Sequence, residues 1–305
     1  AARVPGRGVD QRADHQRRRR LGDAAVSGAR TTRVGFIGLG SQGGPMARRI
    51  AEEGYPLTLW ARRRETTDAF ADTGAQVAGT PAELAAASDI VCLCVVADAD
   101  VEDVLLRADG VLAGLAAGGV VAVHATIHPD TCRRIAEEAA KQDVAVVDAP
   151  VSGGGPAAAE RRLLVMAGGA EADVARCRPV FEAYADPVIH LGPLGSGQLA
   201  KLLNNFVFTA QVGLALDTFA FADGLGMDRA AVAQVLASGS GGSRAAAILS
   251  AGGFNTAGLR QARGLLQKDI GIMLDVARAA DTAEPAELAR LAAHTLTILD
   301  APAAP

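Results

Sequence analysis

The strongest constraint on the fold is a regular alternation of apolar and helical segments that begins at Arg33. The apolar segments are short and end in glycine or polar residues, which is typical of buried strands. Repeated strand–helix–strand units of this length predict a parallel sheet with helices on both faces. The predicted strands are 33–40, 57–60, 89–96, 118–126, 144–151, 163–169 and 187–192, and the predicted helices between them include 43–53, 65–73 and segments that begin at Pro81 and Pro129.

Strand signals stop after Gly195, and helices are predicted at 195–224, 228–237, 243–251, 260–280 and 284–299. We therefore predict an α/β chain, with an N-terminal Rossmann-type doubly wound parallel sheet followed by an all-α domain. The dinucleotide-binding domain is expected at 32–194, and a helical domain for substrate binding and oligomerisation at 195–305.

Residues 1–31 differ from the rest because they are rich in arginine and have no apolar periodicity. Such a segment cannot bury enough surface to fold, and it lacks the apolar core of a secretory signal. We interpret it as a disordered leader that is not part of the native protein, with the natural start at Val26.

Composition excludes several functional classes. The net charge of −4 argues against nucleic acid or an acidic membrane as the main partner. The most apolar helix is interrupted by Lys201, Asn204, Asn205 and Gln211, so no membrane span is expected.

Cysteine and histidine positions indicate a reduced, metal-free protein. Cys92 and Cys94 alternate along a predicted buried strand, and the other two cysteines stand alone, which favours free thiols in the cytoplasm. A metal or redox pair at Cys92 and Cys94 is the alternative, which burial in a strand explains better. His124 and His128 lack a nearby carboxylate cluster, so we expect no metal site.

The loop Gly38-Leu39-Gly40-Ser41-Gln42-Gly43 has the pattern GxGxxG between the first predicted strand and helix. In this context Gly38 permits a tight turn, Gly40 lets the backbone approach a pyrophosphate, and Gly43 allows close packing of helix and strand. The helix N-terminus then faces the anion. The pattern predicts a dinucleotide site.

The end of the second strand indicates which dinucleotide is bound. An NAD site usually has an acidic residue there, whereas this strand ends with Arg62, Arg63 and Arg64. Arg62 and Arg63 suit a 2′-phosphate, so we predict NADP, with NAD as the alternative cofactor. A solvated basic cluster is the other explanation.

Lys201 is the only charged residue between Gly195 and Leu216. A helix so apolar is normally buried, and desolvation lowers the pKa of a lysine toward the range of a general base. Asn205 lies one turn further on the same face and can bind what the lysine holds. A lysine that extends to solvent along its stem is the alternative.

Four motifs in order resemble those of the β-hydroxyacid dehydrogenases, the group of 3-hydroxyisobutyrate dehydrogenase, tartronate semialdehyde reductase and glyoxylate/succinic semialdehyde reductase. They are GFIGLGSQGGPMA (35–47), DAPVSGG (148–154), GSGQLAKLLNN (195–205) and QKDIGIML (267–274), with ATIHP (125–129) similar to a further family segment. The resemblance runs from Arg33 to about Ala280.

The resemblance implies a role for each matching position. Lys201 corresponds to the catalytic lysine, and Asn205 to the asparagine that holds the substrate. Ser152, Gly153 and Gly154 correspond to a substrate loop whose N–H groups receive a carboxylate, with Ser152 also expected in catalysis. The positions expected to contact the cofactor are Val95, Val96, Thr126 and Lys268.

The chain also departs from the family pattern. Ala157 and Arg161 stand where glycine is usual, and Asp100 stands where hydroxyisobutyrate enzymes have Asn. Arg244 replaces an apolar or aromatic residue of several relatives. A guanidinium there predicts a substrate with two anionic groups or a longer acid, and an exposed capping arginine is the alternative.

We therefore expect an NAD(P)-dependent oxidoreductase that acts on a small β-hydroxyacid or semialdehyde acid, with Lys201 as general acid and base. The apolar helices predict a homodimer or homotetramer. The alternatives are an imine reductase-like enzyme, which Lys201 disfavours, and a dinucleotide-binding scaffold without catalysis.

Overall fold

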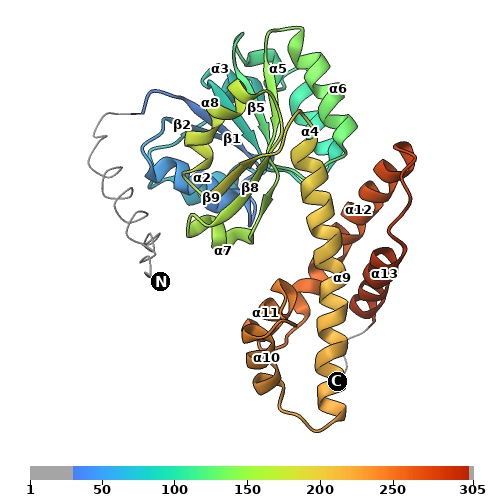
Figure 1. Cartoon of the computed structure of the whole chain (residues 1–305). Helices are drawn as coiled ribbons and strands as arrows, with labels where there is room; N and C mark the ends of the chain where they lie inside the picture. Colours follow the sequence, from blue (N-terminus) through green and yellow to red (C-terminus); the bar gives the residue numbers. More distant parts are fainter. Residues whose placement is uncertain (1–29, 302–305) are drawn as a thin grey trace, which may run out of the picture.

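The computed structural model describes residues 30–301, in which a sheet with flanking helices is followed by a group of helices (Figure 1). This confirms the predicted fold class. The predicted leader lies outside the described residues apart from Arg30 and Thr31. Arg30 contacts the sheet part, because its guanidinium donates to the Glu53 carbonyl and lies 4.5 Å from the centre of the Tyr55 ring.

The main sheet has six parallel strands in the order β3-β2-β1-β4-β5-β6. The chain order reverses between β1 and β4, and ligands of such sheets bind where the carboxyl ends of the strands meet this reversal. The strands are β1 (Val34–Ile37), β2 (Leu57–Trp60), β3 (Gln76–Val77), β4 (Ile90–Leu93), β5 (Val120–Val123) and β6 (Ala145–Asp148).

Alternate strand residues enter two separate cores, one on each face of the sheet. In β1, Phe36 packs on one face and Ile37 on the other, because successive side chains of a strand point in opposite directions. One face is covered by α2 (Gly43–Glu52), α7 (Gly154–Ala159) and α8 (Glu171–Phe181). The other is covered by α3 (Pro81–Ala86), α4 (Asp98–Leu106), α5 (Val111–Gly114) and α6 (Pro129–Ala140).

The last strands form a second sheet, which the sequence did not separate from the first. β7 (Val151–Ser152) is antiparallel to β8 (Leu163–Ala167), and β8 is parallel to β9 (Ala185–His190). The single strand predicted at 144–151 is wrong, because Pro150 has no N–H to continue the ladder. The chain leaves β6 there and pairs with β8 instead.

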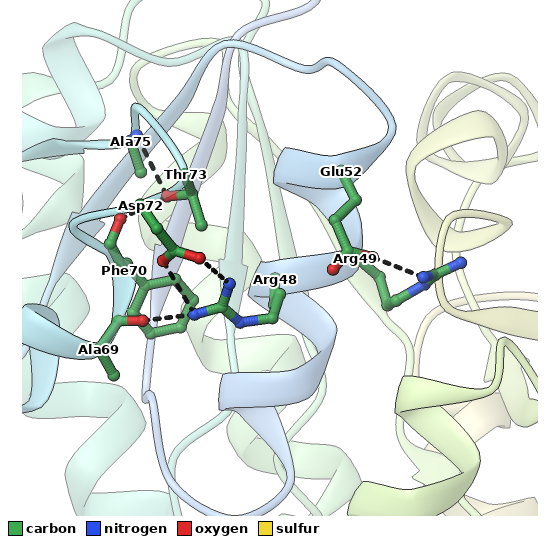
Figure 2. A network of polar contacts seen from close by, with 8 residues as sticks. All are labelled: Arg48, Arg49, Glu52, Ala69, Phe70, Asp72, Thr73 and Ala75. Carbon is green, nitrogen blue, oxygen red and sulfur yellow. Dashed lines mark hydrogen bonds and ion pairs between the residues drawn. The ribbon is translucent and has the colours of Figure 1, made fainter.

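The helix predicted at 65–73 is also wrong: the segment is a 3₁₀ helix, η1 (Arg64–Phe70). The hydroxyls of Thr66 and Thr67 donate to carbonyls three residues back, which favours the tighter winding. Figure 2 shows Arg48 of α2 joining this segment through Asp72 (2.9 Å) and the Ala69 carbonyl. The short elements β3, α4, α5 and α7 were not predicted.

The helices that follow are α9 (Ser196–Gly224), α10 (Arg229–Ser238), α11 (Arg244–Ala251), α12 (Ala257–Ala279) and α13 (Ala286–Asp300). Each begins and ends within three residues of its predicted bounds. α9 extends away from the sheet through the whole helical part, with α11, α12 and α13 against it (Figure 1). The division near residues 193–197 stays a prediction.

By length and composition alone, α9 is the one helix among residues 30–301 that could span a membrane. One side of α9 packs as a core helix does, because Leu202, Phe206 and Phe219 are buried against neighbouring elements, whereas another side is exposed. Core helices of globular proteins pass the same test.

Asp148 joins the sheet to the start of α9. Its buried carboxylate accepts hydrogen bonds from the backbone N–H groups of Gly195 and Gln198, both at 2.7 Å. These N–H groups would otherwise be unpaired at the helix N-terminus. Burial raises the pKa of Asp148, and the backbone hydrogen bonds act against that rise.

Gln198 adds a second connection through its fully buried side chain. Its amide donates to the Ala125 carbonyl at 2.8 Å and accepts from the Ile127 N–H at 3.1 Å. Thr126 lies between these two residues. The two connections therefore fix the start of α9 against the carboxyl ends of β5 and β6.

Asp148→Asn is expected to lower the free energy of unfolding by about 2 to 4 kcal/mol, because an N–H₂ group would face a buried backbone donor. Urea unfolding measures the change, with Glu160→Ala as a surface control. A loss of less than about 0.5 kcal/mol, the size of an ordinary surface effect, would show that Asp148 does not hold this junction.

Candidate active site

A cavity of about 570 Å³ lies between the carboxyl edge of the main sheet and helices α9, α11 and α12. Ten of the predicted site residues line it: Gln42, Val95, Val96, Thr126, Ser152, Gly153, Lys201, Asn205, Arg244 and Lys268. The other eight do not line it: Gly38, Leu39, Gly40, Ser41, Gly43, Gly154, Arg62 and Arg63. Residues of the sheet part and of the helical part thus line one cavity.

The glycine loop has the shape that a dinucleotide requires. Gly38 has φ +98°, and a Cβ there would lie 2.2 Å from the Cys94 carbonyl oxygen. A Cβ on Gly43 would lie 1.9 Å from the Gly38 oxygen, so both positions exclude a side chain. Gly40 instead faces open space, which leaves room for a pyrophosphate at the start of α2.

Arg62 and Arg63 are both exposed after β2. Arg62 forms an ion pair with Asp100 at 3.2 Å. Asp100 is itself fixed at the start of α4, where it accepts from the Ala97 N–H at 3.2 Å. Asp100, which departs from the family pattern, therefore forms an ion pair with Arg62, one of the two arginines expected at the 2′-phosphate.

The loop after β7 explains two further departures. Gly153 and Gly154 have φ +135° and +77°, conformations that favour glycine. Arg161 has φ +56°, in a place where relatives have glycine, and its guanidinium pairs with Glu53. Ala157 is buried against Gly153. The departures thus leave a formed loop, with Ser152 and Gly153 at the cavity.

Lys201 lies half-buried in the cavity wall. Within residues 30–301 its ammonium makes no hydrogen bond or ion pair. Burial lowers the pKa of Lys201 to about 8; the nearby Lys268 ammonium adds to this effect, and the Asp269 carboxylate opposes it. At neutral pH such an amine exchanges its proton readily.

Asp269 is a site residue that the sequence analysis did not select. It is 4% exposed, and its Oδ2 accepts from Asn205 Nδ2 at 2.6 Å. Its Oδ1 lies 3.1 Å from Lys268 Nζ without a hydrogen bond of good geometry. Lys268 also donates to the Thr126 carbonyl, so Asp269 connects α9, α12 and the β5 loop. The sequence pattern of Lys268 followed by Asp269 does not indicate that Asp269 contacts Asn205.

In the structure, both ring nitrogens of His124 contact protein groups. Its Nδ1 lies 2.7 Å from the Ala149 carbonyl, and its Nε2 lies 3.1 Å from the Tyr184 hydroxyl. Burial lowers the pKa of His124 to about 4, so the ring is neutral at physiological pH. His124 follows β5 and contacts Ala149, so it connects the end of β5 with the segment that leads to Ser152. In the part of the chain that the structure describes, no group of His, Cys, Asp or Glu is arranged for a metal.

Comparison with known proteins defines the class. Residues 33–192 match the model of the NAD binding domain of 6-phosphogluconate dehydrogenase, and residues 195–302 match that of the NAD-binding domain of NADP-dependent 3-hydroxyisobutyrate dehydrogenase. The chain is therefore an NAD(P)-dependent oxidoreductase.

Individual relatives agree with this class. The chain is 30% identical to the NAD-dependent L-serine dehydrogenase of Pseudomonas aeruginosa, over 83% of this chain and 87% of the relative. Mycobacterium tuberculosis 3-hydroxyisobutyrate dehydrogenase with L-serine has a TM-score of 0.76 and 27% identity, covering 88% and 93% of the two chains. Psf3 in complex with NADP+ and 2-OPP has a TM-score of 0.76 and 26% identity, with the same coverage. The chain belongs to the 3-hydroxyisobutyrate dehydrogenase family.

The imine reductase alternative has weaker support. An imine reductase from a Pseudomonas species shares 21% identity with a TM-score of 0.54, which shows a common fold alone.

The electrostatic arrangement can be tested directly, since the chain has three lysines, Lys141, Lys201 and Lys268. Asp269→Asn should lower the pKa of Lys201 below about 8, because it removes the carboxylate that stabilises the ammonium. The measurement is NMR titration of ¹³C-dimethylated lysines, with Asp275→Asn on the exposed side of α12 as control. An unchanged or raised pKa of Lys201 would contradict the proposed coupling.

Proposed function

We propose that this enzyme prefers NADP and interconverts a short β-hydroxyacid and its carbonyl form, with Lys201 as the general acid and base. The observation that carries the proposal is Lys201 in the cavity wall with a pKa of about 8. Ser152 and Gly153 line the same cavity and supply a carboxylate site. Thr126, Val95 and Val96 face the same space.

The chemistry assigns one task to each group. The glycine loop from Gly38 to Gly43 would hold NADP+, which would supply the acceptor for the hydride of the substrate carbon. Lys201, in its neutral form, takes the hydroxyl proton and returns it in the reverse direction, so that charge and atoms balance. Asn205 is held by Asp269 and orients the hydroxyl. Such a positioned base contributes about 10²- to 10⁴-fold to the rate.

Lys201→Ala is expected to lower kcat by about 10²- to 10⁴-fold, because no other group then takes the hydroxyl proton. The dissociation constant for NADPH should stay within about threefold. Stopped-flow absorbance and fluorescence titration measure the two quantities, with exposed Lys141→Ala as the matched control. Activity within about tenfold of the wild type would assign Lys201 a structural role.

The preference for NADP rests on Arg62 and Arg63, which follow β2 without an acidic residue before Glu65. Asp100 limits the conformations of the Arg62 side chain through their ion pair. An arginine fixed in this way loses less conformational freedom when it binds a phosphate.

Arg62→Ala and Arg63→Ala should each weaken NADPH binding by about 1.5 to 3 kcal/mol, the cost of a lost charge-assisted hydrogen bond. NADH binding should change little. Calorimetric titration with both cofactors makes the comparison, and Arg107→Ala serves as an exposed control. A wild-type preference for NADH, or equal losses for both cofactors, would refute the assignment.

An exposed apolar face along α9 supports a homodimer or homotetramer. Leu203, Leu214 and Phe221 lie on one side of the helix, and Phe221 is 70% exposed. A contiguous apolar surface of this kind is typical of subunit interfaces. We expect Phe221→Glu to shift sedimentation velocity toward the monomer, whereas Lys141→Glu, on the exposed end of α6, should change little. A wild-type protein that is already monomeric at micromolar concentration would contradict the prediction.

Localisation in the cytoplasm fits the four free cysteines, of which Cys92, Cys132 and Cys177 are buried. A scaffold without catalysis is the remaining alternative. A half-buried lysine with a lowered pKa is not needed in a scaffold, and turnover of any hydroxyacid with NADP+ would exclude one.

A further inference from the structure

We propose that Gln211 and Arg244 form a second substrate subsite in the same cavity, for an anionic group at the far end of an extended β-hydroxyacid. The inference rests on the proposed function, which places the reacting carbon at Lys201. It adds the class of substrate: a 3-hydroxyacid with more than four carbons that carries a second carboxylate or phosphate.

One face of α9 sets the length of the site. Lys201, Asn205, Phe208 and Gln211 recur at spacings of three and four residues, and all four line the cavity. Because an α-helix rises 1.5 Å per residue, Lys201 and Gln211 are about 15 Å apart along the axis. The cavity is therefore elongated along α9 beyond what a four-carbon acid reaches.

Arg244 supplies the charge at the distal end. It is the first residue of α11, whose N-cap Ser243 accepts from the Ala246 N–H at 3.1 Å. The cap fixes the backbone, so the Arg244 guanidinium projects from an ordered position. Across residues 30–301, neither Arg244 nor Gln211 has a side-chain hydrogen bond or ion pair. Their donors are therefore free for a bidentate contact with a carboxylate or phosphate.

The charges that line the cavity favour a dianion. Three basic residues line it, Lys201, Arg244 and Lys268, against the single carboxylate of Asp269. Asp269 already binds Asn205 and lies beside Lys268, so it does not neutralise Arg244. An anionic group of the ligand would supply complementary charge at the distal end.

The wall between the two ends is apolar. Phe208, Ile248 and Leu265 line it, and Ile248 lies one turn after Arg244 on α11. Methylene groups of a substrate would contact these apolar side chains there. The order of groups in the ligand is thus a carboxylate and hydroxyl near Ser152 and Lys201, then methylenes, then an anion at Arg244.

The test compares 3-hydroxydicarboxylates of increasing length with 3-hydroxymonocarboxylates of the same length, for example 3-hydroxydodecanedioate with 3-hydroxydodecanoate. In the wild type, kcat/KM should be higher for the dicarboxylate. In Arg244→Leu, the ratio of the two kcat/KM values should fall at least about tenfold, the factor that one charge-assisted hydrogen bond is worth. Gln211→Leu should lower the ratio less. Arg290→Leu removes an exposed arginine that pairs with Glu287, and should leave the ratio unchanged.

A second measurement does not depend on turnover. Sebacate and dodecanedioate lack the hydroxyl, and calorimetry measures their binding to the enzyme with NADP+; affinity that Arg244→Leu lowers at least tenfold supports the subsite. Equal binding to both proteins, or an unchanged substrate ratio, overturns the subsite while the dehydrogenase assignment stands. If no 3-hydroxyacid is oxidised, the proposed function fails, and the dodecanedioate comparison still decides the subsite.

Discussion

The site depends on one buried junction, the contact of Asp148 and Gln198 with the first turn of α9. Asp148 ends the strand β6 and binds two helix N–H groups, while Gln198 binds the β5 loop on either side of Thr126. Lys201 lies less than one turn beyond Gln198. Hydrogen bonds to the backbone therefore set the position of Lys201 relative to the carboxyl edge of the main sheet. Such bonds tolerate little displacement.

The backbone at this junction is packed so closely that two of its glycines exclude a side chain. A Cβ on Gly168 would lie 2.4 Å from Asp148 Oδ1, and one on Gly197 would lie 2.2 Å from the Met166 carbonyl oxygen. Gly197 and Gly168 therefore serve close approach, whereas Gly195 supplies a backbone φ of +95° at the start of α9. Around this fixed point, Asp269 and Lys268 act in opposite directions on the pKa of Lys201. The lowered pKa of the half-buried Lys201 amine results from the balance between these two charges and desolvation.

Local sequence patterns predicted the elements that have strong local signals. Apolar strands and the glycine loop were found because their periodicity and turn chemistry are local. The split of 144–151 into β6 and β7 was missed, because the apolar run continues through Pro150 and the partner strand β8 lies more than ten residues away. The 3₁₀ winding of η1 depends on threonine hydroxyls and on Arg48 of another helix, neither of which periodicity reveals. Asp269 and Gln198 were missed for the same reason: their partners are 64 and 71 residues distant in sequence.

The sequence by itself determined the fold class, the cofactor loop and the choice of Lys201 as the residue of interest, since each follows from residue type and spacing within one element. Only the tertiary structure decided which side chains share a cavity, that Asp100 forms an ion pair with Arg62, and that Arg244 and Gln211 line one cavity without a side-chain partner among the described residues. The physical reason is that pKa shifts, ion pairs and cavity walls arise from groups brought together by packing. Such groups lie on different elements, and no pattern along the chain encodes their distance.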